Sequence, residues 1–300
     1  MIGVPAYRSA VTLRAPATYF ALVALVALAA CGRASTTTTT STVEVVNGPV
    51  KRVVALVPSI AEDLFAVGAG DKVVGVSAYT DYPPQAKPLP QIATFASIST
   101  ERIVALHPDL AVGIVSQERL VDDLRRAKVQ VMLLHDDSYA DIFNNLIALG
   151  VVTDRRRDAE AYVRRLRART AAILRGVKPH RRPPSVFVVL GTAPIFTVGK
   201  GSYIDTLIAM AGGRNAAADI NAPYARYSAE ALVARQPDVL IADPDIRLRD
   251  VLGQAPWTAL RAVRGHHLYV LPDAAILERP GPRYNDGLAW LVATLAKVST

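Results

Sequence analysis

The sequence predicts an α/β fold with two three-layer lobes, each built on a mostly parallel sheet, joined by one long rigid α-helix. Three observations lead to this prediction. Short apolar runs alternate with helical segments, which is typical of parallel strands covered by helices on both faces. One central segment, residues 154–176, has the strongest helical periodicity in the chain. A ten-residue pattern occurs once on each side of that segment.

The central segment has the pattern of a long amphipathic helix. Thr153 or Asp154 is placed to cap its start, and Gly176 is placed to end it. One face is rich in arginine. A helix of this kind serves as a nucleic-acid arm, a coiled-coil strand or a strut between two lobes. The opposite face repeats at three- and four-residue steps and consists of Ala159, Tyr162, Val163, Leu166, Thr170, Ile173 and Leu174.

The repeated pattern is a short helix, a Pro-Asp pair and a buried strand. Residues 101–110 read ERIVALHPDL and residues 230–239 read EALVARQPDV, so each copy opens on a glutamate, Glu101 or Glu230. Two copies at such a long separation indicate duplicated halves rather than a solenoid. With one half on each side, the central helix is expected to be a strut whose apolar stripe lies on both lobes.

The alternation also assigns the elements of each half. Ser59 and Glu62 have the spacing of a capping box at the first helix, and Ser202 with Asp205 is expected to cap a helix in the second half. Tyr224 is assigned to a loop. Strands are expected at 52–58, 72–77, 109–115, 129–135, 185–191, 238–243 and 266–272, and helices at 59–68, 99–106, 119–127, 139–149, 202–212, 228–236, around 257 and at 284–298.

The first 30 residues have the pattern of an export signal. Arg8 and Arg14 precede residues 15–30, which carry no charge and are short for a membrane span. The segment leads into Leu-Ala-Ala-Cys at Cys31, which resembles a bacterial lipobox, in which the cysteine is lipidated. An ordinary signal with a chance cysteine, or a plain membrane anchor, is the alternative. Under the lipobox interpretation the protein is exported and held on the outer face of the cell membrane, or on the periplasmic side.

These patterns divide the chain into five parts. We expect a lipoprotein signal peptide at 1–30, a flexible Ser/Thr-rich tether at 31–49, an N-terminal α/β lobe at 50–152, the connecting helix at 153–177 and a C-terminal α/β lobe at 178–300. Cys31 is the only cysteine, so no disulfide forms within the chain. The net charge of +8 is compatible with nucleic-acid binding. Because an exported, anchored protein seldom meets nucleic acid, no such partner is expected.

Catalytic motifs are scarce, and no enzyme activity is expected. Gly199-Lys200 lacks the earlier glycine and the following Ser or Thr of a phosphate loop, and no Gly-x-Ser-x-Gly elbow is present. The five histidines are scattered, so no metal site is expected. His135, at a strand end beside Asp136 and Asp137, is the best exception. An exported hydrolase is the alternative from a different class.

Aromatic side chains in the predicted loops favour ligand binding. Tyr79 and Phe95 belong to loops of the first half, and Tyr224 precedes the second copy of the repeat. Ligands of open α/β sheets bind beyond the carboxyl ends of the strands, so aromatic side chains of both halves are expected to face each other across a cleft. Arg226, Arg279 and Arg283 are expected to pair there with carboxylates or phosphate of a ligand.

Four segments, VGVSAYTDYPPQA, ERIVALHPDL, PIFTVGKG and ERPGPR, occur in the order found in substrate-binding proteins of iron-siderophore and cobalamin ABC importers. The chain resembles this family from roughly residue 52 to residue 297. The resemblance implies a ligand held between two lobes, with little hinge closure. It implies that Tyr79 contacts the ligand, and that Phe95 and Tyr224 stand where cobalamin-binding members have tryptophans. It also implies that Glu101 and Glu230 dock into arginines of the membrane permease.

The expected protein is therefore a monomeric, lipid-anchored receptor of an ABC importer. Its partners would be the permease with its ATPase subunits and a transported cobalt- or iron-containing chelate: cobalamin, another corrinoid or a ferric siderophore. No resident cofactor is expected. The alternative ligands are haem, or a bare metal ion held by His135 and neighbouring carboxylates.

Overall fold

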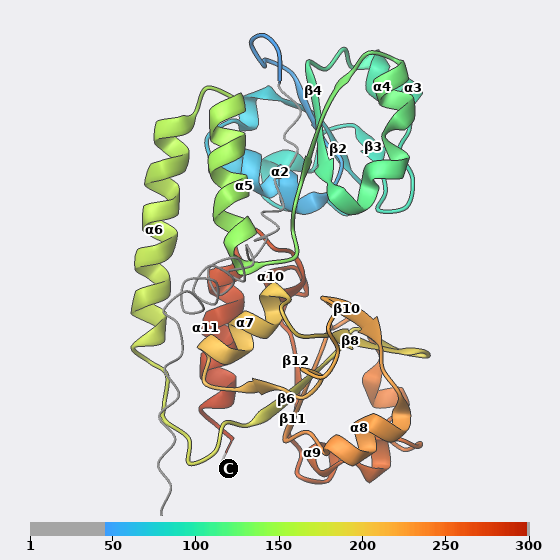
Figure 1. Cartoon of the computed structure of the whole chain (residues 1–300), viewed down its shortest axis with the longest axis vertical. Coiled ribbons are helices and arrows are strands. Elements are labelled where there is room, and N and C mark those ends of the chain that lie inside the picture. Colours follow the sequence, from blue (N-terminus) through green and yellow to red (C-terminus); the bar gives the residue numbers. More distant parts are fainter. Residues whose placement is uncertain (1–45, 299–300) are drawn as a thin grey trace, which may run out of the picture. The chain divides into compact units, whose positions relative to one another are not determined.

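The computed structural model describes residues 46–298 (Figure 1). The signal peptide predicted at 1–30, Cys31 and residues 32–45 of the predicted tether lie outside the described residues. In the last part of that tether, the Asn47 N–H donates to Gln130 Oε1 at 2.7 Å. Of the helices in residues 46–298, none combines the length and the apolar character that a bilayer crossing requires.

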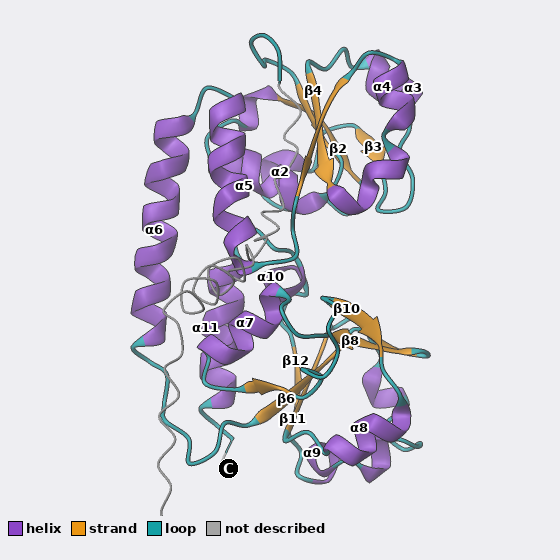
Figure 2. Ribbon diagram, viewed as in Figure 1, coloured by secondary structure: helices purple, strands orange, loops and turns teal. Residues whose placement is uncertain are grey.

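The N-terminal lobe is built on one parallel sheet with the strand order β3-β2-β1-β4-β5. Every residue of the central strands β1 and β4 is buried, as expected for strands covered on both faces. Helices and strands alternate along the chain (Figure 2). The elements are β1 (Val53–Ala55), α2 (Pro58–Ala66), β2 (Val73–Ser77), β3 (Gln91–Ala93), α3 (Thr100–Ala105), β4 (Leu110–Ile114), α4 (Asp122–Arg126), β5 (Gln130–Leu134) and α5 (Tyr139–Val152).

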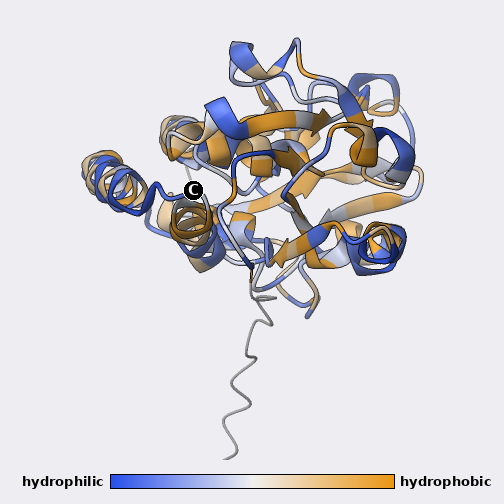
Figure 3. Cartoon of the chain, turned by 90° about the horizontal axis from the view of Figure 1, so that it is seen from above, coloured by the Kyte–Doolittle hydropathy of each residue, from blue (hydrophilic) through white to orange (hydrophobic). Residues whose placement is uncertain are grey.

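The C-terminal lobe has a parallel sheet, β12-β11-β6-β9, and a separate antiparallel sheet, β10-β8-β7. The strands are β6 (Ser185–Val189), β7 (Gly191–Thr192), β8 (Ile195–Val198), β9 (Arg214–Asn215), β10 (Tyr224–Arg226), β11 (Val239–Ala242) and β12 (Leu268–Val270). The helices are α7 (Tyr203–Met210), α8 (Ala229–Arg235), α9 (Arg261–Arg264), α10 (Ala275–Glu278) and α11 (Tyr284–Leu295). Hydrophobic residues concentrate in the strands (Figure 3). The predicted fold class, two α/β lobes with mostly parallel sheets, is confirmed.

The connecting helix is α6 (Arg156–Leu174), an uninterrupted helix of 19 residues. It packs against α5 of the N-terminal lobe and α11 of the C-terminal lobe. The strut with its apolar stripe on both lobes is therefore confirmed. The predicted start was wrong in detail, because the Thr153 hydroxyl donates to the Leu149 carbonyl at 2.6 Å and no side chain caps α6. The buried face consists of Ala159, Val163, Leu166 and Thr170.

The internal repeat extends to the backbone. His107 and Gln236, at matching places before the Pro-Asp pair, both have φ of 45°. The Asp109 carboxylate accepts a 2.8 Å hydrogen bond from the N–H of Arg52, just before β1. In the second copy, the Asp238 carboxylate accepts a 2.8 Å hydrogen bond from the N–H of Ser185, at the start of β6. In each lobe the repeat thus joins the beginnings of two adjacent parallel strands.

Two local predictions were wrong. The residue before α2 is Val57, with Pro58 in the first turn, so Ser59 and Glu62 do not form a capping box. Proline at the first helical position has the right φ and no N–H to satisfy, which moves the start of the helix forward. Tyr224 belongs to β10 rather than to a loop, because residues 224–226 pair with residues 196–198 of β8. The Ser202 cap of α7 is confirmed by the hydrogen bond that its hydroxyl accepts from the Asp205 N–H.

Candidate ligand-binding site

A cavity of about 740 Å³ lies between the two lobes. Its walls follow the carboxyl ends of parallel strands: β1 and β2 on one side, β11 and β12 on the other. This is where open α/β sheets place their ligands. The N-terminal lobe contributes Pro58, Ala78, Tyr79, Asp81 and Phe95, and the C-terminal lobe contributes Asp243, Pro244, Asp245, Pro272, Asp273, Ala274, Ala275, Glu278 and Arg279.

Two predicted ligand-binding aromatic residues line this interlobe cavity. The Tyr79 side chain is 80% exposed and Phe95 is 71% exposed. Tyr79 has φ of 66°, in the left-handed region that residues other than glycine seldom adopt. The turn is held by contacts of its neighbours, including the bond between the hydroxyls of Ser77 and Thr80 at 3.2 Å. A strained conformation of this kind persists only where the surrounding structure enforces it, and it is common at ligand-binding sites.

Arg279, also predicted to contact the ligand, lies in the wall of the cavity with its donors engaged inside the protein. One terminal nitrogen donates to Glu62 at 3.0 Å and to Asp81 at 2.7 Å, and the other donates to the Tyr79 carbonyl at 3.0 Å. Arg279 therefore ties the C-terminal lobe to the loop that carries Tyr79. A direct role toward a ligand stays a prediction.

The side chain at the centre of the lobe junction is Glu62 of α2, which sequence reasoning missed as a site residue. Its carboxylate is 1% exposed and accepts two hydrogen bonds of 2.8 Å from Arg283 besides the one from Arg279. Arg283 also pairs with Asp273 at 2.8 Å. The adjacent Asp63 is fully buried, and burial, then the charge of Glu62, raise its pKa well above the ordinary value. The signal for this junction was the ERPGPR segment, which contains both arginines.

Acidic side chains dominate the C-terminal wall of the cavity. Burial, followed by the nearby negative charge of Asp243, raises the pKa of Glu278 to about 8. The Oε1 atom of Glu278 is buried and has no hydrogen-bond partner within the described part of the chain. Asp243 accepts the N–H of Asp245 at 2.6 Å, where the loop after β11 turns. Sequence reasoning missed these three acids, although Asp243 directly follows an apolar strand.

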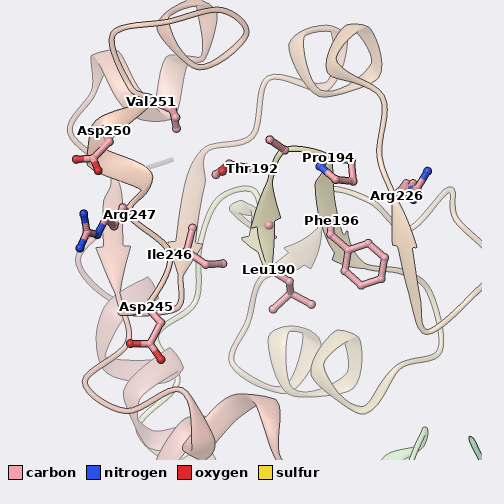
Figure 4. Close-up of a pocket in the computed structure, with 12 residues that line it drawn as sticks. Leu190, Thr192, Pro194, Phe196, Arg226, Asp245, Ile246, Arg247, Asp250 and Val251 are labelled. Carbon is pink, nitrogen blue, oxygen red and sulfur yellow. The ribbon is translucent and has the colours of Figure 1, made fainter. Parts of the chain in front are cut away.

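The structure does not bring Tyr224 and Arg226 into the interlobe cavity. Tyr224 is half-buried against the main hydrophobic core, and burial, then the charges of Asp136 and Asp137, raise the pKa of its hydroxyl. Arg226 is exposed and lines a second cavity of about 720 Å³ within the C-terminal lobe, with Phe196 and Asp245 (Figure 4). Asp245 lines both cavities, so the two adjoin. The ligand roles of Tyr224 and Arg226 stay predictions.

Glu101 and Glu230 occupy the first turns of α3 and α8, one on each lobe, and both are exposed. Hydrogen bonds with its own backbone N–H, then with the Ser228 hydroxyl, hold the pKa of Glu230 below its ordinary value. Both carboxylates are therefore presented to solvent at equivalent places of the repeat. Their docking role stays a prediction.

The candidate metal ligand His135 follows β5 and is half-buried. Burial, then the charges of Asp137 and Asp141, raise the pKa of the neighbouring Asp136 to about 7. Within residues 46–298, no group of three or more His, Cys, Asp or Glu side chains is arranged to hold a metal ion.

Comparison with known proteins agrees with this architecture. Residues 53–275 match the family described as periplasmic binding protein. The vitamin B12-binding protein of Vibrio parahaemolyticus serotype O3:K6 (strain RIMD 2210633) is 30% identical over 80% of this chain and 87% of its own length. The uncharacterized ABC transporter substrate-binding lipoprotein YvrC of Bacillus subtilis (strain 168) is 25% identical, over 82% of this chain and 80% of its own.

Among solved structures, the periplasmic heme-binding protein RhuT from Roseiflexus sp. RS-1, in apo form, superposes with a TM-score of 0.74 and 29% identity. The match covers 84% of this chain and all of RhuT. The relatives named here are binding proteins rather than enzymes. The extent of these matches and the two lobes on one helical strut lead to one conclusion: the chain belongs to the periplasmic binding protein family.

Proposed function

We propose that this protein is the substrate-binding receptor of an ABC importer and that it binds a metal chelate in the interlobe cavity. The observation that carries the proposal is the cavity itself. A volume of about 740 Å³ lies within the usual range of ligand pockets, and Tyr79 and Phe95 stand largely exposed at its wall. A broad, partly apolar ligand would cover both rings. Removing their apolar surface from water and stacking against them would each stabilise the complex.

A corrinoid is the first candidate ligand, because the Vibrio parahaemolyticus relative is named a vitamin B12-binding protein. Haem is the second, because RhuT, with a similar level of identity, is named a heme-binding protein. The family resemblance keeps ferric siderophores as a third class. All three are broad metal chelates that a receptor carries without converting.

Export and anchoring complete the proposal. Residues 1–30 have the pattern of a lipoprotein signal that precedes Cys31, and the Bacillus subtilis relative is named a lipoprotein. Glu101 and Glu230 supply one exposed carboxylate on each lobe for docking to basic side chains of a permease. Labelling with a radioactive fatty acid is expected to mark the unmodified protein and not a Cys31→Ser variant, and an unlabelled unmodified protein would contradict lipid anchoring.

The test is a titration of the purified protein with cyanocobalamin, cobinamide, haemin, ferrichrome and ferrioxamine B. Absorbance changes report binding, and the melting temperature reports stabilisation. A ligand present at about a hundred times its Kd adds about 2.7 kcal/mol to the free energy of unfolding. Binding of one class in the micromolar range or tighter supports the proposal. If no chelate binds, the proposed function is wrong.

A further inference from the structure

The interlobe cavity has an unequal charge lining. Five carboxyl groups and one guanidinium group contribute to its wall. The guanidinium, that of Arg279, is already bound to Glu62, Asp81 and the Tyr79 carbonyl. It is therefore not a free positive pole for an anionic ligand. The carboxyl groups belong to Asp81, Asp243, Asp245, Asp273 and Glu278.

Two of these acids form ion pairs with arginine, and the other three form none among the described residues. Asp81 pairs with Arg279 at 2.7 Å and Asp273 pairs with Arg283 at 2.8 Å. Within residues 46–298, no Lys, Arg or His forms an ion pair with any of the other three, which are Asp243, Asp245 and Glu278. They stand together, because Asp243 receives the Asp245 N–H and its charge acts on Glu278.

Two further features of the same cavity indicate an occupant that donates hydrogen bonds. Glu278 shares a side-chain hydrogen bond with Asp243, and its buried Oε1 atom receives no donor within residues 46–298, an arrangement that costs free energy unless a donor reaches it. On the facing lobe, Tyr79 and Phe95 present exposed rings, and the faces of such rings attract cations. The arginines Arg226 and Arg247 line the adjoining cavity beyond Asp245 and not this one.

We propose that Asp243 and Asp245 make the interlobe cavity selective for metal chelates whose bound face is cationic or rich in amide N–H groups, and that they exclude chelates edged with carboxylates or catecholates. This inference rests on the proposed function and narrows it. A corrinoid with amide side chains satisfies the requirement. Haem, with its two propionates, does so only if those groups point away from the acidic wall.

The experiment compares ligands of one shape and opposite charge. Cobinamide, which has amide side chains and a cationic metal centre, and cobyrinic acid, which has the same ring edged with carboxylates, are titrated at low and high salt. We expect cobinamide to bind at least a hundredfold more tightly at low salt. The ratio of the two affinities should fall at high salt, because the added ions screen the carboxylates of the cavity wall. Ferrioxamine B, a cation, and ferric enterobactin, a trianion, form a second pair for a receptor of siderophores.

Variants assign the selectivity to the acids. Asp243→Asn combined with Asp245→Asn should reduce the ratio of cobinamide affinity to cobyrinic acid affinity about tenfold or more. Glu160→Gln removes an exposed carboxylate from α6 and should leave the ratio unchanged. The salt dependence of the unmodified protein needs no variant, so misfolding of a variant cannot decide the outcome.

The two hypotheses fail differently. If chelates bind and the anionic member of a pair binds as tightly as the cationic member, the selectivity inference is wrong and the receptor function stands. If no chelate of either charge binds, the proposed function is wrong and the inference falls with it.

Discussion

Glu62 and Arg283 hold each other by two parallel hydrogen bonds of 2.8 Å across the lobe junction, 221 residues apart in the chain. Arg279 adds a third bond to the same carboxylate. The paired, planar geometry of an arginine–carboxylate fork fixes orientation as well as distance. The two lobes are therefore connected by a buried ionic network, in addition to α6.

The first prediction concerns this network. Glu62→Gln leaves two partly buried guanidinium groups without their shared carboxylate, so the free energy of unfolding should fall by about 3 kcal/mol. Urea denaturation measures the loss. Glu160→Gln, which removes an exposed partner of Arg156, should change it by less than about 1 kcal/mol. Equal effects of the two variants would show that the junction adds nothing to stability.

The second prediction concerns pH. The pKa of Glu278 is raised from its ordinary value to about 8, chiefly by burial and then by Asp243. Between about pH 5 and pH 8 the unfolded chain loses this proton while the folded protein keeps it, so stability falls as pH rises through that window. In Glu278→Gln this pH-dependent loss of stability, on the order of a few kcal/mol between about pH 5 and pH 8, should disappear. Thermal unfolding across the window checks it, and identical slopes for both proteins would contradict it.

The third prediction uses the repeated aspartate. Burial opposes ionisation of Asp238, but the bonds from Ser185 and the charges of Arg261 and Arg182 hold its pKa below the ordinary value. A lowered pKa means that the ionised group stabilises the fold above about pH 4 and loses that effect as pH falls. Asp238→Asn should cost about 2 kcal/mol at neutral pH and clearly less at about pH 3. A cost independent of pH would contradict the ionic role.

The fourth prediction concerns the aromatic wall. Phe95→Ala should weaken chelate binding about tenfold, since one stacked ring contributes about 1 kcal/mol beyond its buried area. Because Phe95 is 71% exposed, its removal should alter stability by less than about 0.5 kcal/mol. Val104→Ala, which shortens another exposed apolar side chain outside the cavity wall, is the control. Unchanged affinity in Phe95→Ala would exclude the ring from the site.

The fifth prediction concerns docking. Glu101→Arg combined with Glu230→Arg should leave chelate affinity unchanged, because neither residue lines the cavity, and should lower uptake more than tenfold by placing like charges against a basic permease. Uptake into cells that lack their own receptor measures this. Glu160→Arg on α6 carries the same change of charge elsewhere. Normal uptake with the double variant would refute the docking role.

Much of the fold could be predicted because local sequence patterns indicate most of its helices and strands. The apolar runs at β1, β4, β6 and β11 are bounded by turn residues, and the stripe on α6 keeps its spacing through five turns or so of helix. The antiparallel sheet was missed because β7, β8 and β10 have two to four residues each. Unlike β1, which is equally short but lies within the apolar run 53–57, these strands have too little pattern around them to be recognised from sequence.

The site could be predicted only in part. The position of Tyr79 and Phe95 at the cavity wall could be predicted because both follow strands of a parallel sheet, whose carboxyl ends border ligand clefts. Glu62 resembled an ordinary residue of a capping box, and its burial depends on arginines more than two hundred residues away. Asp243 and Asp245 resembled a solvated turn, since only the opposite lobe turns that loop into a cavity wall.

The uninterrupted helix α6 has a consequence for stoichiometry at the membrane. Together with the Glu62–Arg283 fork, it restrains the two lobes, so under the proposed function we expect the spacing of Glu101 and Glu230 to change little when a ligand binds. A permease that recognised only this spacing would accept empty and loaded receptors alike. Empty receptors would then compete with loaded ones for the docking surface of the permease. Under the proposed function, uptake would therefore be fastest when the number of receptors matches the supply of ligand, and slower when receptor is in excess.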